Sequence, residues 1–266
     1  MKKPLELLFD AIKNGDFNAA SDILKKSPET AIKKNNGEFV LSYAIDENQI
    51  AIAEKIIKYN PCSVNQIVKE VTFGHLTAFA NALSKKKLSI VKKMIPHIKY
   101  RILTSLPVNQ KKELLHGIDY IALYGDFELI ELIIKKYPKF ENEYLLSEKV
   151  SNNLLIKCII QENYELVINI LHKYPKLFSM KYFNESYVWI SLPYAFLKYV
   201  KKIDKQSEEK INTLLELIFK NSLNDDIEVP GYKEMTPLAW CLHSNQKYLA
   251  EKILLLSPES IDKFID

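Results

Sequence analysis

The chain has 266 residues, of which 47% are hydrophobic and 26% are charged, a composition typical of a soluble globular protein and not of a disordered chain. No uninterrupted apolar run approaches the roughly 18 residues of a spanning helix, so we expect no membrane insertion. The formal net charge of +4 comes almost entirely from lysine, which lacks the planar fork that reads bases, and Arg101 is the only arginine, so we expect no nucleic acid as a partner.

The N-terminus does not have the pattern of a secretory signal peptide. Met1 to Pro4 is followed by an amphipathic stretch, Leu5 to Leu24, instead of a continuous apolar segment. We therefore expect a cytoplasmic protein. The three cysteines, Cys62, Cys158 and Cys241, are odd in number and lack the spacing of paired metal ligands. This arrangement predicts reduced thiols and argues against a disulfide framework and a thiolate zinc site.

One sequence unit recurs along the chain, and its second half gives the clearer signal. In each full copy, apolar residues spaced three, three and one apart are followed four positions later by a proline. That spacing predicts an amphipathic helix with one buried stripe, which the proline brings to an end. The full copies are Phe17, Ala20, Ile23, Leu24 and Pro28; Ile50, Ala53, Ile56, Ile57 and Pro61; Phe127, Ile130, Ile133, Ile134 and Pro138; and Tyr164, Val167, Ile170, Leu171 and Pro175. The altered copies are Leu88, Val91, Met94 and Ile95 with an early Pro96; Leu215, Ile218 and Phe219; and Ala250, Ile253 and Leu254 with Pro258.

The first half of each unit predicts a shorter helix that packs closely against its neighbour. A small residue stands at a fixed distance upstream of the second helix in five copies, at Ala11, Ala44, Ala82, Cys158 and Cys241. Residue types that tolerate a left-handed turn stand between the two helices, at Gly15, Asn48, Gly125 and Asn245. Each unit is thus predicted to form helix, tight turn, helix and stop, and the units must stack to bury their apolar stripes.

The last unit shows which known repeat this pattern resembles. Thr236-Pro237-Leu238-Ala239-Trp240-Cys241 opens its first helix, and Gly231-Tyr232 precedes it as a hairpin turn would. The unit resembles the ankyrin repeat, whose pattern is a Thr-Pro-Leu-His opening, a small residue, a glycine turn and a Val-x-x-Leu-Leu second helix. The third unit, Thr77 to Ala82, is similar, although no copy holds the complete opening tetrapeptide. The interval between the first two units is 33 residues, as is usual in the family.

The resemblance implies an all-α fold, namely a solenoid of about seven stacked helix-turn-helix ankyrin-like repeats that spans residues 1–266 as a single domain. Several intervals are longer than 33 residues, and we assign the additional residues to enlarged loops at Ser63 to Gly74, His97 to Lys112 and Glu141 to Lys149. The largest insertion lies near 201–210, where we expect it to lengthen or separate the helices of the sixth repeat. An α-solenoid of the HEAT or TPR type is the alternative architecture.

The sequence presents no arrangement of residues that predicts catalysis or cofactor binding. A nucleophilic cysteine needs a histidine within reach, but Cys241 and His243 are two positions apart, so their side chains diverge on a helix. The histidines are scattered, and neither a zinc-binding helix motif nor a phosphate-binding glycine loop occurs. We therefore expect a non-enzymatic protein without a cofactor or a metal site. An enzyme with catalytic residues in the enlarged loops, such as Lys201 to Lys210, is the alternative.

In ankyrin proteins the first helix of each repeat lines a concave groove that contacts partner proteins, and the resemblance implies the same role here. The corresponding positions lie one before, two after and three after the small residue. From them we select these candidate partner-binding residues: Tyr43, Asp46, Glu47, Lys85, Tyr120, Tyr124, Lys157, Gln161, Trp240 and His243. Exposed aromatic residues beside polar ones are favoured in binding hot spots. The alternative for these aromatic residues is packing between adjacent repeats.

The sequence therefore predicts a protein-protein interaction module that holds another protein on its concave face. Divergent repeats and a composition rich in lysine, asparagine and isoleucine make the chain similar to ankyrin-type effectors of intracellular bacteria, which bind host proteins. That similarity implies a location in the cytoplasm, or in the host cytosol for a secreted effector.

Overall fold

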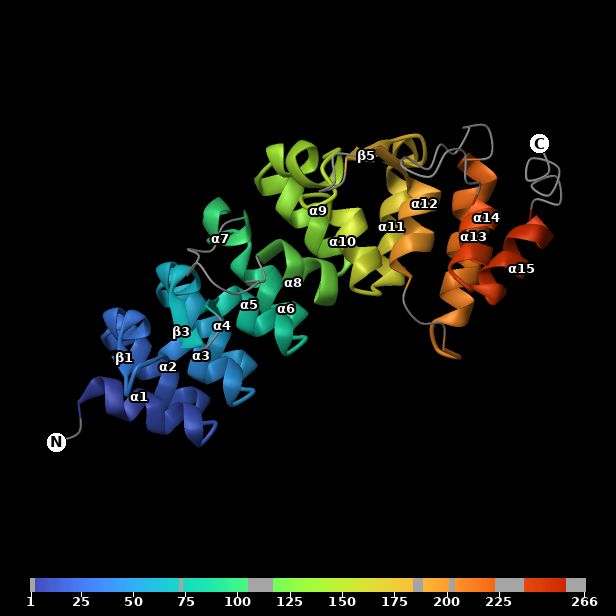
Figure 1. Ribbon diagram of the computed structural model, residues 1–266. Coiled ribbons are helices and arrows are strands. Elements are labelled where there is room, and N and C mark those ends of the chain that lie inside the picture. The colour runs from blue at the N-terminus through green and yellow to red at the C-terminus, as the bar shows by residue number, and fades with distance from the viewer. Residues whose placement is uncertain are drawn as a thin grey trace. The chain divides into compact units, whose positions relative to one another are not determined.

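The computed structural model of the chain describes residues 3–71, 74–104, 117–183, 189–200, 204–222 and 237–256. These residues are mostly helical, with three short two-stranded hairpins, so the predicted all-α class is confirmed (Figure 1). The chain divides into two compact units, Met1–Tyr137 and Pro138–Asp266, which we call unit 1 and unit 2 and describe separately. None of the described helices is long and apolar enough to cross a membrane.

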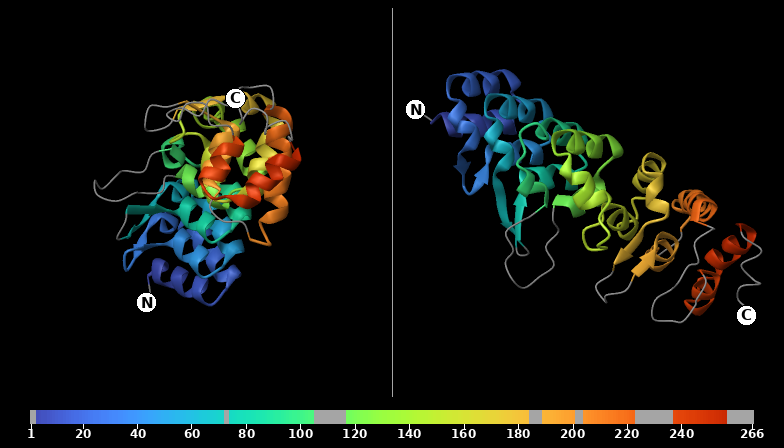
Figure 2. Two further views of the ribbon diagram at one scale, coloured as in Figure 1. Left: turned by 45° about the vertical axis from the view of Figure 1, so that its right-hand side comes forward. Right: turned by 90° about the horizontal axis from the view of Figure 1, so that it is seen from above.

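Unit 1 consists of helix pairs joined by tight turns and separated by short connectors. Its helices are α1 (Pro4–Lys13), α2 (Phe17–Lys26), α3 (Val40–Asp46), α4 (Ile50–Tyr59), α5 (Ala78–Ser84), α6 (Leu88–Met94), α7 (Tyr100–Thr104), α8 (Gly117–Tyr124) and α9 (Phe127–Lys136). Its connectors contain the 3-10 helices η1 (Pro28–Ile32) and η2 (Pro61–Asn65) and the antiparallel hairpins β1 (Lys34–Asn35) with β2 (Glu38–Phe39) and β3 (Ile67–Val71) with β4 (Gly74–Thr77). The first helices α1, α3, α5 and α8 contact one another in succession, and so do the second helices α2, α4, α6 and α9 (Figure 2).

Unit 2 also contains a row of first helices and a row of second helices. Its elements are the π-helix η3 (Glu141–Leu145), α10 (Leu154–Ile160), α11 (Tyr164–Lys173), the 3-10 helix η4 (Pro175–Phe178), β5 (Lys181–Phe183), β6 (Trp189–Ser191), α12 (Leu192–Tyr199), α13 (Glu208–Ser222), α14 (Pro237–His243) and α15 (Lys247–Leu256). The first helices α10, α12 and α14 are in successive contact, as are the second helices α11, α13 and α15. The sequence pattern predicted the second helix of the pair α12–α13 but not its first helix, α12.

The apolar stripe predicted for the second helices forms the core. The second apolar residue of the pattern is at most 3% exposed in every copy, at Ala20, Ala53, Val91, Ile130, Val167, Leu215 and Ala250. The small residues of the first helices are buried as well, at Ala11, Ala44, Ala82, Cys158 and Cys241. Their short side chains let the two helices of a pair approach closely. Burial of each larger side chain, such as Leu24 or Ile56, stabilises the fold by about 1.5–3 kcal/mol.

Five of the turns between paired helices share one backbone conformation. In each, one residue adopts a positive φ, between 55° and 66°, at Gly15, Asn48, Lys86, Glu162 and Asn245. The N–H of the following residue then donates to the carbonyl oxygen of the small residue of the first helix, over 2.7 to 3.0 Å. These pairs are Asp16 with Ala11, Gln49 with Ala44, Lys87 with Ala82, Asn163 with Cys158 and Gln246 with Cys241. This is the Schellman motif, which satisfies the carbonyls at a helix C-terminus.

The predicted turn residues are correct in three of four cases. The left-handed conformation is confirmed at Gly15, Asn48 and Asn245, but the prediction is wrong at Gly125, whose φ is not positive. A Cβ atom at Gly125 would lie 2.5 Å from the carbonyl oxygen of Ile121, so this position needs glycine because another backbone group approaches closely.

The prolines end the second helices as predicted. The helices α2, α4, α9 and α11 stop at Lys26, Tyr59, Lys136 and Lys173, each two residues before a proline. Pro28, Pro61 and Pro175 then begin the short helices η1, η2 and η4. Proline suits the first position of a helical turn because the N–H that it lacks would have no partner there. Pro258 lies outside the described residues.

The predicted enlarged loops contain short regular elements. Ser63 to Gly74 holds the end of η2 and the strand β3, and Glu141 to Lys149 holds η3. The loop His97 to Lys112 begins with α7, and its part beyond Thr104 lies outside the described residues. Near 201–210 the insertion separates α12 from α13, and α13, with 15 residues, is the longest described helix.

Hydrogen bonds from side chains to the backbone join successive copies of the sequence unit. In unit 1, the Gln66 amide donates to the Ile32 carbonyl over 2.7 Å, and the Asn65 amide donates to the His97 carbonyl over 3.0 Å. The Lys136 ammonium donates to the Ile95 carbonyl over 2.7 Å. Each bond satisfies a backbone oxygen in a connector that lacks the hydrogen-bond ladder of regular structure. The copies are thereby held in a fixed register.

Candidate protein-binding faces

The selected residues lie on two faces, one in each unit. The unit 1 face consists of Tyr43, Asp46 and Glu47 at the end of α3, Lys85 directly after α5, and Tyr120 and Tyr124 on α8. The unit 2 face consists of Lys157 on α10, Gln161 directly after it, and Trp240 and His243 on α14. Because successive first helices contact one another, each face runs across several helices.

Tyr43 is half-buried and packs against the preceding first helix. Its ring stacks on that of Phe9 from α1, with centroids 4.8 Å apart and planes inclined by 27°. Desolvation raises the pKa of the Tyr43 hydroxyl, and the nearby carboxylates of Glu47, Glu38 and Asp10 raise it further. The hydroxyl therefore stays protonated at neutral pH and can donate a hydrogen bond. Phe9 was missed, although it lies two positions before the small residue of its own helix.

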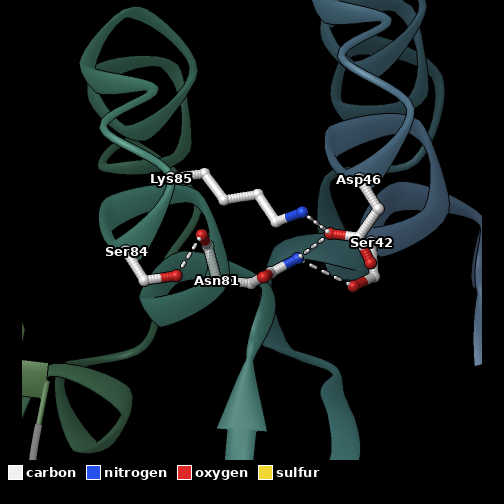
Figure 3. A network of polar contacts seen from close by, with 5 residues as sticks. All are labelled: Ser42, Asp46, Asn81, Ser84 and Lys85. Carbon is white, nitrogen blue, oxygen red and sulfur yellow. Dashed lines mark hydrogen bonds and ion pairs between the residues drawn. The ribbon is translucent and has the colours of Figure 1, made fainter.

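A polar cluster joins α3 to α5 in the middle of the unit 1 face (Figure 3). Asn81 is only 5% exposed, and its side-chain nitrogen donates to the Ser42 hydroxyl over 3.1 Å and to the Asp46 carboxylate over 2.9 Å. The Lys85 ammonium lies 2.9 Å from the same carboxylate oxygen of Asp46. On the other side, the Ser84 hydroxyl donates to the Asn81 carbonyl over 2.9 Å. Asp46 and Lys85 therefore pair with each other and are also exposed at the surface.

Tyr120 and Tyr124 form an aromatic pair along one side of α8. Both are half-buried, and their ring centroids are 6.4 Å apart, as expected for residues one helical turn apart. Desolvation raises the pKa of Tyr120, with smaller contributions from Tyr124 and Asp119. The pair thus presents two aromatic edges and two hydroxyls on one helix.

Trp240 lies at the centre of an aromatic cluster in unit 2. Its ring meets that of Tyr194 on α12 edge to face, with centroids 5.1 Å apart, and the His243 ring lies 6.4 Å away. Its indole nitrogen is buried and has no hydrogen-bond partner among the described residues. The Lys198 ammonium lies 5.8 Å from the Tyr194 ring centroid. Aromatic packing between successive first helices is therefore observed here, as it is for Tyr43.

Tyr194, which is buried beneath the unit 2 face against Trp240, was not selected by the sequence pattern. It was missed because the insertion after α12 removes this helix from the spacing of the other copies. A local signal was nevertheless present, since Tyr194 directly precedes the small residue Ala195, as Tyr43 precedes Ala44. Pro193 also stands in the first turn of α12, as Pro237 stands in the first turn of α14.

Lys157 and Gln161 lie on α10 and at its C-cap, and both are half-buried. The helix α10 contacts α12, the helix that carries Tyr194. His243, by contrast, is exposed at the end of α14. The unit 2 face thus combines one aromatic cluster with a lysine, an amide and an imidazole.

The buried cysteines have properties that disfavour nucleophilic chemistry. Desolvation raises the pKa of Cys241 to about 12, and complete burial raises that of Cys158 as well. A thiol with so high a pKa keeps its proton at neutral pH, whereas the nucleophile is the thiolate. Cys241 instead supplies the carbonyl of a Schellman turn and the small side chain that the close helix contact needs.

One open pocket, of about 540 Å³, lies in the predicted loop Glu141 to Lys149. The residues that line it are Asn142, Glu143, Tyr144, Leu146, Ser147, Glu148, Lys149 and Asn152. Neither a cysteine nor a histidine is among them, and no group of three potential metal ligands occurs among the described residues. The residues that line this pocket therefore supply neither a cysteine thiol nor an imidazole base.

The two faces share one combination of side chains. Both faces place aromatic side chains beside charged or amide groups, and in unit 1 the hydrogen bond from Asn81 to Asp46 also joins successive first helices. Comparisons with models of known protein families and with curated proteins find no match for this sequence.

Proposed function

We propose that the chain is a non-enzymatic interaction module that binds another protein on the faces of its first helices. The observation that carries this proposal is the recurrence of large or polar half-buried side chains at one register position, directly before the small residue. These are Tyr43 in unit 1 and Lys157 and Trp240 in unit 2, whereas Tyr194, at the same position of α12, is buried. Partly exposed aromatic residues beside polar groups can bury a large area on binding at a low cost in side-chain entropy.

We further propose that the architecture is a degenerate ankyrin-repeat solenoid. Five Schellman turns in one register and successive contacts within each row of helices support it. The hairpins β1–β2, β3–β4 and β5–β6, which lie between helix pairs, favour an ankyrin-type over a HEAT or TPR-type repeat, because ankyrin repeats combine a β-turn with two helices. The resemblance to ankyrin-type effectors extends the proposal to a cytoplasmic location, or to the host cytosol for a secreted effector.

Affinity capture with matched variants tests the binding proposal. The wild-type chain, the variant Tyr120→Ala with Tyr124→Ala, and the variant Trp240→Ala are immobilised and exposed to lysates of host and cognate cells. We expect a protein that the wild type retains and that at least one face variant loses. Circular dichroism must show unchanged helicity in both variants, because the aromatic residues are half-buried.

The control is Tyr59→Ala, which removes a half-buried tyrosine from the second helix α4. Like the face variants, it removes an aromatic ring, but from a position outside the two faces. Equal retention by all folded variants would place the binding site elsewhere on the chain, and loss of retention with Tyr59→Ala alone would assign it to the row of second helices.

A further inference from the structure

The sequence contains two Asn-Gly dipeptides that are chemically equivalent but lie in different backbone settings, Asn14–Gly15 and Asn36–Gly37. In such a pair, the backbone nitrogen of the glycine can attack the side-chain amide carbon of the asparagine. Glycine hinders this attack least because it has no side chain. Both asparagines are exposed, so access of water does not distinguish them. The reaction requires the backbone between the two residues to rotate, and local structure therefore decides its rate.

The backbone around Asn14 is held by helical hydrogen bonds. Asn14 is the C-cap of α1, with φ −85° and ψ −3°, and its N–H donates to the Asp10 carbonyl over 3.0 Å. The attacking nitrogen would be that of Gly15, whose N–H donates to the Ile12 carbonyl over 3.1 Å. The Schellman turn also fixes the next residue, Asp16. Attack at Asn14 would break the hydrogen bonds that end α1.

The backbone around Asn36 is much less constrained. Asn36 and Gly37 form the two-residue tip of the hairpin β1–β2, with φ values of 51° and 83°. Positive φ at both positions is the signature of a type I′ turn, for which Asn-Gly is the preferred pair. Only two residue pairs close the hairpin, and no atom would lie within 4 Å of a Cβ at Gly37. So short a hairpin opens at little cost in free energy.

We propose that Asn36 is a site of spontaneous deamidation in the folded protein and that Asn14 is protected. A base in solution removes the Gly37 amide proton, and the nitrogen forms a bond to the side-chain carbon of Asn36. The C–N bond of the side-chain amide then breaks, and ammonia leaves with a proton from solvent. Water opens the resulting succinimide at either carbonyl to give aspartate or isoaspartate, so one water is consumed, one ammonia is released and no oxidant is needed.

The product would change the hairpin both electrostatically and geometrically. A new carboxylate would lie two residues from Lys34, whose ammonium lies 4.5 Å from the Phe39 ring centroid. Isoaspartate also adds a methylene to the backbone of a turn that tolerates only two residues, which would disturb the pairing of Lys34 with Phe39. Phe39 is the N-cap of α3. This chemistry needs no partner protein and is independent of the proposed binding function.

Peptide mass spectrometry of the aged protein tests the proposal. The full chain is incubated at neutral pH and physiological temperature, with and without urea, and the aspartate and isoaspartate peptides at both positions are separated and quantified over time. We expect deamidation at Asn36 to be at least about tenfold faster than at Asn14 in the folded chain, because opening a helix end costs more than opening the hairpin. In urea the two rates should converge.

The variant Asn36→Gln is the control, because a longer side chain forms the corresponding ring poorly. It should abolish conversion at that position and leave the rate at Asn14 unchanged. Equal rates at the two positions in the folded chain would overturn the proposal. So would a folded chain in which Asn36 stays intact while the chain in urea converts at both positions.

Discussion

Asn81 shows how one buried amide fixes the position of two helices. Its side-chain nitrogen donates hydrogen bonds to both Ser42 and Asp46, and the Ser42 side chain is fully buried. The change Asn81→Ala would leave a buried hydroxyl without this donor, at a cost of about 1–3 kcal/mol of unfolding free energy. Urea unfolding monitored by circular dichroism measures the change.

The matched comparison is Lys85→Ala, which removes the other partner of Asp46. Both members of that ion pair are more than a third exposed, so we expect a loss of only about 0–1 kcal/mol. If the lysine variant lost as much stability as the asparagine variant, the ion pair and not the buried amide would be the main link between α3 and α5.

Because burial raises the pKa of the Cys241 thiol, we expect the folded chain to lose stability in alkaline solution. The pKa of Cys241 is about 12 in the folded chain, whereas an unfolded chain has a thiol pKa of about 8.5. Between these two pKa values the folded state binds more protons than the unfolded state. The stabilisation that the protonated Cys241 thiol contributes is therefore complete below the lower pKa and is lost as the pH rises toward the higher one. The free energy of unfolding should therefore fall above about pH 8.5.

The variant Cys241→Ala isolates this contribution, because alanine occupies the same position in the units that contain Ala11 and Ala44. Urea unfolding at a series of pH values should give a shallower decline for the variant than for the wild type. Parallel curves for the two proteins would show that the thiol does not contribute to the alkaline loss.

At the scale of the element, the Schellman turn shared by five helix pairs predicts how single substitutions in it change stability. Lys86 and Glu162 hold the left-handed conformation at the same position as Gly15, although a side chain makes it unfavourable by about 1–2 kcal/mol. Lys86→Gly and Glu162→Gly should each stabilise the chain by about 0.5 kcal/mol, once the greater freedom of glycine in the unfolded state is subtracted. Gly15→Ala should destabilise it, because a Cβ there would also lie 3.2 Å from the Gln49 amide nitrogen. Thermal unfolding measures all three, and a destabilising Lys86→Gly would contradict the account of the turn.

The second helices were the elements most accurately predicted from sequence, because two independent signals coincide in them. The apolar stripe has the helical period, and a proline follows at a fixed distance, so the end of α4 before Pro61 could be predicted. The hairpins were not predicted, because strands such as Lys34–Asn35 are too short to show a period, and the Asn36-Gly37 turn was the one local signal for β1–β2. The turns at Lys86 and Glu162 were missed for a different reason: neither residue type favours the left-handed conformation.

The candidate faces were only partly predictable, because sequence spacing gives a position but not a contact. Tyr43 and Trp240 were selected as exposed aromatic residues, and both also pack against the preceding first helix, through Phe9 and Tyr194. Such a contact depends on the side chain of another copy, more than thirty residues away, and on a helix, α12, that lies outside the regular spacing.

At the scale of the whole molecule, stability and the proposed binding function depend on the same stacked helices. Each helix pair contacts mainly its neighbours in sequence order, so the core is continuous within a unit. Helices held in a fixed register by groups such as Asn81 form a preorganised surface, which reduces the entropy lost on binding. The account therefore requires that a partner contacts the first helices and not the second helices.

Site-specific photo-crosslinking tests this requirement most directly. A photoreactive amino acid replaces Glu47, which is exposed on the unit 1 face, or Lys58, which is exposed on the second helix α4. With a partner obtained by affinity capture, the account predicts crosslinks from position 47 and none above background from position 58. Crosslinking from position 58 alone would contradict it and would assign binding to the second helices.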